Sequence, residues 1–390
     1  MKIVIVGGVA GGASAAARAR RLSEGAEIVL FERGPEVSFA NCGLPYYVGG
    51  EIAERNKLLI VTPQRLRERF RLDVRVRTSV EAIDRASKTV LVRDLETGRE
   101  YSEGYDKLIL SPGASPLRPP IPGVDLAGIF TLRDLRDADR IKAVTDRGVR
   151  QAVVIGGGYI GLEMVENLVR LNIRTTLVQA MDQLLGTFDR EMTTPIEAHL
   201  AERGVEVLLN ETAAGFSASR DGLDVQLASG RSLTAQLVVM GIGVKPENSL
   251  AVTAGLSVGE RGGIRVNPNL QTDDPDIYAV GDAIEIEDFV LGGAAQIPLA
   301  GPANRQGRLA VNHILALNRR DIGGLGVRRD PRRLRQDRRH DGCLQTIASA
   351  AGTAVPQDLR HPDPQPAGYP GARPFSLKVL FDPEDRQVLS

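Results

Sequence analysis

The stretch Ile3-Val4-Ile5-Val6-Gly7-Gly8-Val9-Ala10-Gly11-Gly12 decides the fold of this chain of 390 residues. Its β-branched run predicts a strand, and the glycine-rich turn after it leads into an alanine-rich helical stretch over residues 13–22. A second predicted strand, residues 28–31, ends at Glu32, about twenty residues past the glycines, where a dinucleotide-binding unit carries a carboxylate for a ribose hydroxyl. The glycines let the backbone approach a pyrophosphate at the positive end of the helix, although Val9 occupies the place of the middle glycine. The residues predicted to bind this first dinucleotide are Gly7, Gly8, Ala10, Gly11, Gly12, Glu32 and Arg33.

The same pattern recurs later in the chain. A predicted strand at 152–155 meets Gly156-Gly157-Gly158-Tyr159-Ile160-Gly161, and a helix to residue 171 and a strand at 175–178 follow. The acid position holds Gln179, which accepts a hydrogen bond from a ribose hydroxyl but carries no charge to repel a 2′-phosphate, so the choice between NADH and NADPH stays open. Arg174 is either a partner for such a phosphate or, as we favour, a solvated residue between helix and strand. The residues predicted to bind this second dinucleotide are Gly156, Gly158, Gly161 and Gln179.

A single thiol lies between the two glycine turns, in the run Ser38-Phe39-Ala40-Asn41-Cys42-Gly43-Leu44-Pro45-Tyr46-Tyr47. No second cysteine is near it, and the only other one in the chain is Cys343. A chain that binds two dinucleotides and has one thiol between them is expected to move electrons from a nicotinamide, through a flavin, to sulfur. The alternative for Cys42 is a buried, inert small side chain, which we consider the weaker interpretation.

Composition favours small-molecule chemistry in the cytoplasm. Acidic and basic side chains balance at 49 each, so no bulk field attracts nucleic acid or anionic lipid. The two cysteines cannot form a disulfide framework, and Met1 and Lys2 run straight into an apolar strand, so we expect no signal peptide and no membrane span. The four histidines are scattered without ligand spacing, so no metal site is expected.

Two further segments narrow the interpretation. Asp276-Ile277-Tyr278-Ala279-Val280-Gly281-Asp282 predicts a strand that ends in Gly-Asp, and residues 105–114 predict a strand that runs into a glycine turn. Together with the first unit they resemble the FAD-dependent pyridine nucleotide-disulfide oxidoreductases. The resemblance implies an α/β fold with two Rossmann-like domains, in which an NAD(P) domain at 119–244 is inserted into an FAD domain at 1–118 and 245–322. It also implies that Asp282 holds the flavin ribityl chain, with further flavin contacts from Ser111, Pro112, Gly113, Gly281 and Pro298.

Within that family the chain is similar to the coenzyme A-disulfide reductases and the NAD(P)H-dependent persulfide reductases, over about residues 1–322. The most specific pieces are 38–45 and 297–307. Dithiol members carry a second cysteine where this chain has Tyr47, so Cys42 is expected to form a mixed disulfide with a small thiol such as coenzyme A, or a sulfenate. The resemblance implies that Tyr159 is a gate and that Glu163 lies near the flavin ring. It places coenzyme A on Ser14, Arg18, Arg21, Ser38, Asn41 and Asn304.

The C-terminal part departs from the family pattern. Arginines cluster over residues 319–339, and 323–366 show almost no apolar periodicity, so this segment is predicted to be disordered. The pattern resumes over 367–390, including Tyr369, which predicts an incomplete α+β interface domain; a shifted reading frame or a divergent linker would explain the interruption. The homodimer that the resemblance implies is therefore doubtful for this chain. The alternatives left open are an NADH oxidase or peroxidase that cycles Cys42 through a sulfenate, and a non-catalytic flavoprotein remnant.

Overall fold

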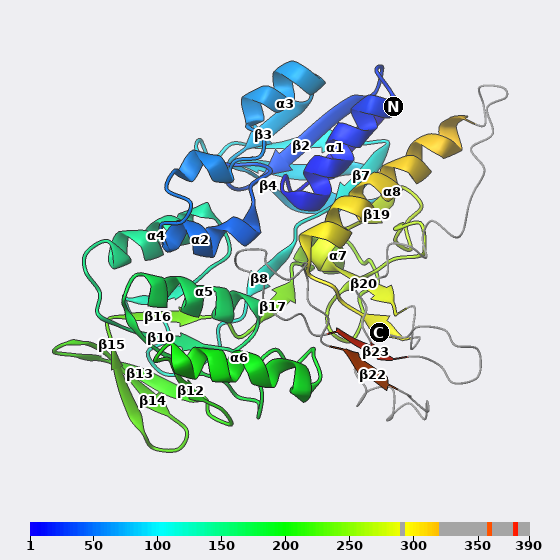
Figure 1. Cartoon of the computed structure of the whole chain (residues 1–390). Helices are drawn as coiled ribbons and strands as arrows, with labels where there is room; N and C mark the ends of the chain where they lie inside the picture. Colours follow the sequence, from blue (N-terminus) through cyan, green and yellow to red (C-terminus); the bar gives the residue numbers. More distant parts are fainter. Residues whose placement is uncertain (289–292, 320–356, 361–376, 381–390) are drawn as a thin grey trace, which may run out of the picture.

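The computed structural model describes residues 1–288, 293–319, 357–360 and 377–380 (Figure 1). Its first unit is built on a five-stranded parallel sheet in the order β19-β7-β1-β2-β3. Its central strand is fully buried through Ile3, Val4 and Ile5, as expected for a parallel sheet that is covered on both faces. The strands are β1 (Lys2–Val6), β2 (Glu27–Glu32), β3 (Asp73–Val76), β7 (Lys107–Leu110) and β19 (Ile277–Ala279).

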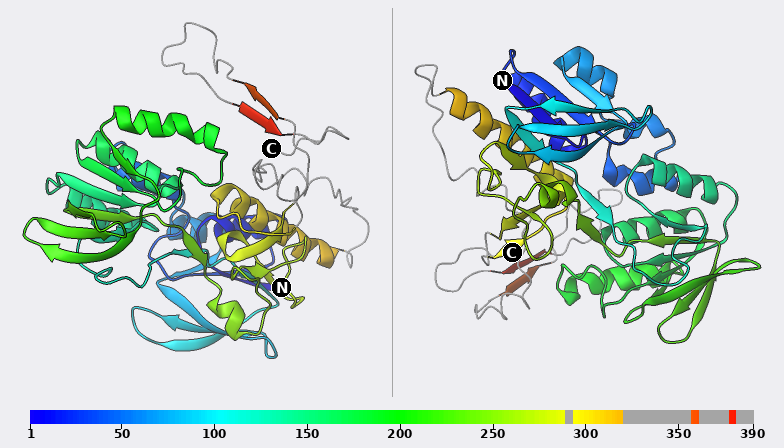
Figure 2. Two further views of the ribbon diagram at one scale, coloured as in Figure 1. Left: turned by 90° about the horizontal axis from the view of Figure 1, so that it is seen from below. Right: turned by 180° about the vertical axis from the view of Figure 1, so that it is seen from behind.

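Two long helices cover one face of this sheet. Helices α1 (Ala10–Leu22) and α8 (Ala300–Arg319) lie side by side in front of it (Figure 1). An antiparallel sheet of β4 (Thr78–Asp84), β5 (Thr89–Asp94) and β6 (Glu100–Gly104) lies on the opposite side, as the view from behind shows (Figure 2). Buried side chains of β4 and β5 join the same hydrophobic core as β1 and β2. The sheet is thus covered on both faces, so a ligand is expected at the ends of its strands.

The second unit repeats the architecture of the first. Its five-stranded parallel sheet has the order β12-β11-β10-β16-β9, so β10, like β1, is the central strand and precedes the glycine turn. The strands are β9 (Ile129–Thr131), β10 (Gln151–Ile155), β11 (Arg174–Val178), β12 (Glu206–Leu208) and β16 (Leu237–Met240). The helices are α4 (Leu135–Thr145), α5 (Tyr159–Arg170) and α6 (Arg190–Glu202), and an antiparallel sheet comprises β13 (Ala213–Ser219), β14 (Gly222–Leu227) and β15 (Ser232–Ala235).

The chain crosses between the units twice. The crossing strands β8 (Ala114–Pro116) and β17 (Val244–Pro246) pair antiparallel with one another. They lie close to the domain boundaries predicted from the sequence, 118/119 and 244/245. The predicted α/β fold with two Rossmann-like units is therefore confirmed, and the first unit takes its strand β19 and helix α8 from beyond the second.

The remaining elements are short. They are α2 (Leu44–Val48), α3 (Pro63–Phe70), α7 (Ser249–Thr253), β18 (Ile264–Arg265), β20 (Ile284–Glu287), β21 (Ala294–Ala295) and the 3₁₀ turns Asn41–Gly43, Arg55–Leu58 and Gly281–Ala283. No helix among the described residues is long and apolar enough to cross a membrane.

Part of the C-terminal prediction is corrected by the structure. Strand β22 (Gln357–Arg360) lies within the segment expected to be disordered, and it pairs antiparallel with β23 (Leu377–Leu380). The prediction is wrong for these four residues, because pairing with β23 satisfies the backbone groups along one edge of the strand. Residues 323–356 and 361–366, Tyr369 and Cys343 lie outside the described residues, as does most of the predicted interface domain.

Candidate active site

One cavity of about 1360 Å³ joins the two units. Both glycine turns border it, and so do the thiol loop, the strand-to-turn segment after β7 and the start of α8. All the predicted flavin contacts from Ser111, Pro112, Gly113, Gly281, Asp282 and Pro298 line it, together with Asn41, Cys42, Tyr159 and Glu163. The cavity is lined by both dinucleotide-type turns, an arrangement that suits two dinucleotide cofactors meeting within it.

The first glycine turn is built for close backbone approach. Gly7 has φ +94°, and a Cβ on Gly12 would come within 1.8 Å of the Gly7 carbonyl oxygen. Only glycine fits at both positions, and the tight turn aims the first amides of α1 into the cavity. Gly7, Ala10 and Gly11 line the cavity, as does Arg33, while Gly8 and Gly12 lie behind them.

Glu32 is held against this turn by its own carboxylate. Oε2 accepts a hydrogen bond from the Gly8 N–H (2.7 Å), and Oε1 accepts one from the Gly34 N–H (2.7 Å). The side chain therefore stays at the end of β2 and lines the cavity where a ribose is expected. The residues of this half fit FAD: a glycine cradle for its pyrophosphate, a fixed carboxylate for its ribose, and Asp282 farther along the cavity.

The second glycine turn has nearly the same geometry and hydrogen bonding as the first. Gly156 has φ +106°, and a Cβ on Gly161 would come within 1.8 Å of the Gly156 carbonyl oxygen. Gln179 Oε1 accepts a hydrogen bond from the Gly157 N–H (3.0 Å), the counterpart of the bond between Glu32 and Gly8. Gly156, Gly158 and Gln179 line the cavity, and Gly161 supports the turn from behind. Arg174 begins β11, at the end of the strand opposite Gln179, which rules it out as a partner for a phosphate on the ribose.

Asp282 lies in the 3₁₀ turn Gly281–Ala283 at the end of β19. Burial raises the pKa of its carboxyl, and the Arg133 guanidinium, 3.9 Å from Oδ2, partly offsets that effect. The turn is anchored to α8, because Gln306 Oε1 accepts a hydrogen bond from the Gly281 N–H (2.7 Å). Arg133, which also lines the cavity, was missed by the sequence analysis, since no motif distinguishes it from other arginines.

Cys42 lies in the 3₁₀ turn Asn41–Gly43, directly before α2, and its thiol side is exposed to the cavity. The loop before it is fixed to the first glycine turn, because the Ser38 N–H donates to the Gly8 carbonyl (2.9 Å). Tyr47, where dithiol relatives have their second cysteine, is buried, and its hydroxyl donates to Asp139 Oδ1 of α4 (3.2 Å). The thiol loop is thus held by both units, and Cys42 is the one cysteine among the described residues.

Tyr159 and Glu163 lie one turn apart at the start of α5, facing the cavity. The Tyr159 side chain is 52% exposed and packs edge-on against the Phe188 ring, with 6.4 Å between the ring centres. Burial and the neighbouring Glu166 raise the pKa of the Glu163 carboxyl. The Tyr159 side chain is exposed and lightly packed enough to rotate aside, as a gate requires.

Three of the six residues predicted to bind coenzyme A, Ser14, Arg18 and Asn304, lie where α1 and α8 meet. Arg21 lies near the end of α1, and Ser38 and Asn41 belong to the thiol loop. Ser14 Oγ donates to Asn304 Oδ1 (2.7 Å), although these residues are far apart in the sequence. One turn further, Arg18 Nε donates to Asn312 Oδ1 (2.8 Å), and Arg21 stacks on the Phe70 ring. Asn312 and Phe70 were not found from the sequence, because each acts only through a neighbour that the fold brings near. Ser14, Arg18, Arg21, Ser38 and Asn304 do not line the main cavity; Asn41 does.

Comparisons with known proteins agree with this geometry. Residues 1–307 match the model of the family described as pyridine nucleotide-disulphide oxidoreductase. A coenzyme A disulfide reductase from Staphylococcus haemolyticus is 34% identical over 400 residues, which cover 100% of this chain and 86% of that protein. The crystal structure of the reduced Bacillus anthracis protein CoADR-RHD superposes with a TM-score of 0.90 at 41% identity, covering 100% of this chain and 70% of that one. An NAD-dependent persulfide reductase from A. fulgidus gives 0.89 at 32% identity, with coverage of 100% and 73%.

Proposed function

The chain belongs to the pyridine nucleotide-disulphide oxidoreductase family, and we propose that it is an FAD-dependent enzyme that uses NAD(P)H to reduce coenzyme A disulfide, or a related persulfide, at Cys42. One observation carries this proposal: a lone exposed thiol shares a cavity with two dinucleotide-type glycine turns, and Tyr47 occupies the place of a second thiol. Among the described residues no second cysteine lies beside it, so the exchange that we propose is with an external sulfur. The names of the relatives agree with this chemistry.

FAD, when bound, supplies two-electron chemistry that links a nicotinamide to sulfur. The residues that would hold it are Glu32 at the ribose, the first glycine turn at the pyrophosphate and Asp282 at the ribityl chain. The second turn and Gln179 would hold the nicotinamide coenzyme.

Cys42 Sγ performs the exchange. As a thiolate it attacks one sulfur of the coenzyme A disulfide, so that a new S–S bond forms to Cys42, the old one breaks, and one coenzyme A leaves as a thiolate. In the complete reaction NAD(P)H, one proton and the disulfide give NAD(P)⁺ and two coenzyme A thiols. Exposure of Cys42 to the cavity gives the substrate access, and the Ser38–Gly8 backbone bond keeps the thiol loop beside the first turn.

Two side chains on α5 control access and protons. Tyr159 covers the coenzyme end of the cavity and turns aside when the nicotinamide enters. Because burial and Glu166 raise its pKa, the Glu163 carboxyl keeps its proton to higher pH than an exposed carboxyl does. That proton lies in the cavity wall, where negative charge appears when thiolates are released.

The meeting line of α1 and α8 supports the choice of coenzyme A. Arg18 and Arg21 offer guanidiniums to the phosphates of its nucleotide, and Asn312 fixes the direction of Arg18. The Ser14–Asn304 pair, one turn before Arg18 on α1, would contact the pantetheine arm. Oxygen and peroxide need no such set of polar and basic side chains. These residues therefore favour a disulfide reductase over an oxidase.

An anaerobic absorbance titration of the purified protein tests this proposal. We expect NADH or NADPH to bleach the flavin, and added coenzyme A disulfide to restore the oxidised spectrum while releasing two thiols per disulfide. In Cys42→Ser the bleaching should persist and thiol release should fall by at least about a thousandfold, as for loss of a nucleophile. Thiol release retained in Cys42→Ser would refute the assignment. Rapid oxygen consumption with no disulfide reduction would support an oxidase instead.

The cellular setting follows from the same thiol. We propose that the enzyme works in the reducing cytoplasm, where an exposed lone thiol such as Cys42 is kept from oxidation. Its partner is a small-molecule disulfide rather than a macromolecule. Sedimentation of the purified protein tests the homodimer that the family resemblance implies.

A further inference from the structure

We propose that the second dinucleotide site selects NADH over NADPH. This inference rests on the proposed function and names the reductant of the same site. The two coenzymes differ only in a phosphate on the 2′ oxygen of the adenine ribose, so selection depends on the side chains at the end of β11, where that ribose is expected.

Gln179 offers an acceptor there and carries no charge, and one of its two amide N–H donors is already bonded. Its side chain is 8% exposed, and its Nε2 donates to the Gln183 carbonyl (3.0 Å) while Oε1 faces the Gly157 N–H (3.0 Å). Oε1 has a second lone pair for a ribose hydroxyl. A phosphate is an acceptor only, so it would gain nothing from Oε1 and would find at most the one neutral Nε2 N–H that does not bond Gln183.

The charge beside Gln179 is negative. The Glu211 N–H donates to the Gln179 carbonyl (3.0 Å), and the Glu211 side chain lines the same cavity. Hydrogen bonds from Ser229 and Thr212 hold its carboxylate in place and lower its pKa, so it is ionised at neutral pH. A 2′-phosphate carries up to two negative charges, so Glu211 repels NADPH and leaves NADH unaffected.

Arg190, Arg133 and Arg136 do not supply the missing positive charge. From Ile155 to Gly243, the described cavity lining contains no lysine or arginine. Arg190, at the start of α6, is bound by the Asp182 carboxylate and carbonyl, at 2.9 Å each. Arg133 faces Asp282 in the flavin half, and Arg136 is paired with Asp134. A bound 2′-phosphate would therefore meet one fixed carboxylate and an arginine that already has its counter-ion.

The first test compares the two coenzymes in anaerobic flavin reduction by stopped flow, with no disulfide present. We expect kcat/KM for NADH to exceed that for NADPH by at least about tenfold, a typical result of charge repulsion in a binding site. Equal values, or a preference for NADPH, would overturn the inference. If neither coenzyme reduces the flavin, the proposed function fails, which is a distinguishable result.

Variants then test whether charge causes the preference for NADH. Glu211→Gln should raise the NADPH/NADH ratio of kcat/KM by roughly three- to tenfold, and Asp182→Asn should raise it similarly by releasing Arg190. Glu206→Gln is the matched control, because it removes the same charge from the neighbouring β12, where Glu206 pairs with Arg231 at the surface (2.7 Å). An unchanged ratio in both Glu211→Gln and Asp182→Asn, or an equal rise in Glu206→Gln, would refute the electrostatic cause. Since Asp182 lies on an exposed loop, its variant tests the cause even if Glu211→Gln does not fold.

Discussion

Asp282 is the residue at which stability and cofactor binding conflict most directly. Its carboxyl is mostly buried, and burial raises its pKa despite the nearby Arg133. The native apoprotein therefore binds more protons at this site than the unfolded chain does, so the contribution of Asp282 to stability falls as the pH rises from the unfolded pKa through the higher folded one. Above that window the ionised carboxylate destabilises the apoprotein.

We accordingly expect Asp282→Asn to make the flavin-free protein more stable at neutral pH and to flatten this loss of stability between acid and neutral pH. The same change should weaken flavin binding by roughly ten- to a hundredfold, since a hydrogen bond to a charged group is lost. The unfolding temperature of the flavin-free protein, measured against pH, reports the change in stability. The fluorescence of flavin released on dilution reports the change in flavin affinity. Asp125→Asn, at an exposed pair with Arg118, is the control and should change neither. A less stable Asp282→Asn apoprotein at neutral pH would contradict the argument.

A motif fixes the positions of Glu32 and Gln179 in the sequence, and their roles in cofactor binding stay predictions. Glu32 and Gln179 stand at a set distance past their glycine turns, and the structure gives both the same bond to the second glycine of the turn. Arg133 and Asn312 could not be found in this way. Each gains its place from a partner distant in sequence, Asp282 for Arg133 and Arg18 for Asn312, and no local pattern encodes such a pairing.

At the scale of helices and strands, the close contact between α1 and α8 depends on a glycine, Gly307, which has no side chain. A Cβ on Gly307 would come within 2.2 Å of the Gly11 carbonyl oxygen, so Gly307→Ala must push the two helices apart. We expect a loss of about 1–3 kcal/mol in the free energy of unfolding, as for overpacking of a core, together with lower flavin content because α1 carries the pyrophosphate turn. Urea unfolding and the ratio of flavin to protein absorbance measure both.

The matched control is Gly301→Ala on the same helix, where a Cβ would meet nothing within 4 Å. This variant should be neutral or stabilised by up to about 1 kcal/mol, because alanine favours a helix more than glycine does. If Gly307→Ala behaves like Gly301→Ala, the close approach of the two helices is not needed for the fold.

Helices and strands were predictable from the sequence where a regular apolar pattern and a glycine turn mark them. The strand–turn–helix units at 3–22 and 152–171 are present close to where the sequence predicts them. The antiparallel sheets β4–β6 and β13–β15 were not predicted, because their partly exposed strands lack the glycine signature that identifies the Rossmann units in the sequence. Strand β22 was missed for a related reason: it pairs with β23, a strand distant in sequence that nothing within residues 357–360 indicates.

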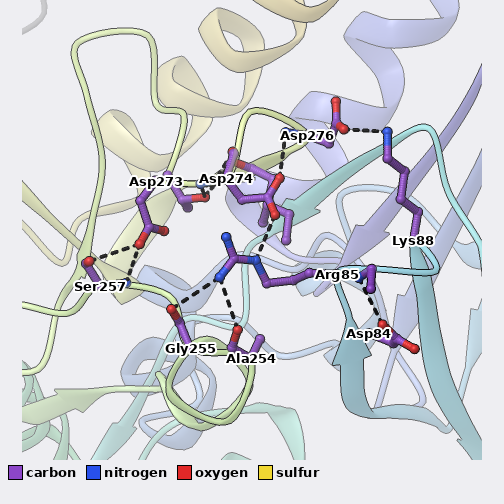
Figure 3. Close-up of polar contacts among 12 residues, drawn as sticks. Asp84, Arg85, Lys88, Ala254, Gly255, Ser257, Asp273, Asp274 and Asp276 are labelled. Carbon is purple, nitrogen blue, oxygen red and sulfur yellow. Dashed lines mark hydrogen bonds and ion pairs between the residues drawn. The ribbon is translucent and has the colours of Figure 1, made fainter.

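At the scale of the whole molecule, the first unit must be assembled from two pieces of chain. Polar contacts across the interface between β4–β6 and the region after α7 join them (Figure 3). Arg85 Nε donates to Asp274 Oδ2 (2.8 Å), and its Nη1 reaches the carbonyls of Ala254 and Gly255. Lys88 pairs with Asp276 (2.5 Å), as does Lys107 of β7. The sequence predicted the split but not these contacts, since every pair spans the inserted unit.

Asp276 is the place to test whether these contacts hold the two pieces together. Burial opposes its ionisation, but hydrogen bonds from Lys107 and Lys88 outweigh that effect and lower its pKa. A carboxyl with a lowered folded pKa stabilises the protein above its unfolded pKa, and this contribution is lost as the pH falls through the folded value. We expect Asp276→Asn to lower the free energy of unfolding at pH 7 by roughly 1–3 kcal/mol, the usual range for a hydrogen-bonded charge, and to reduce the loss of stability in acid.

Flavin retention gives this prediction its second readout. Asp276 immediately precedes β19, and β19 leads to Asp282. Weakening the contacts between the two pieces of the first unit should therefore also weaken the contact of Asp282 with the flavin ribityl chain. Glu96→Gln, at the exposed pair with Arg77, removes a surface ion pair within the first piece alone and should cost less than about 0.5 kcal/mol with no change in flavin content. If Asp276→Asn is no less stable than Glu96→Gln, the two pieces are held by the hydrophobic core of the sheet alone. If it is less stable but retains its flavin, the contacts stabilise the split unit without positioning its cofactor site.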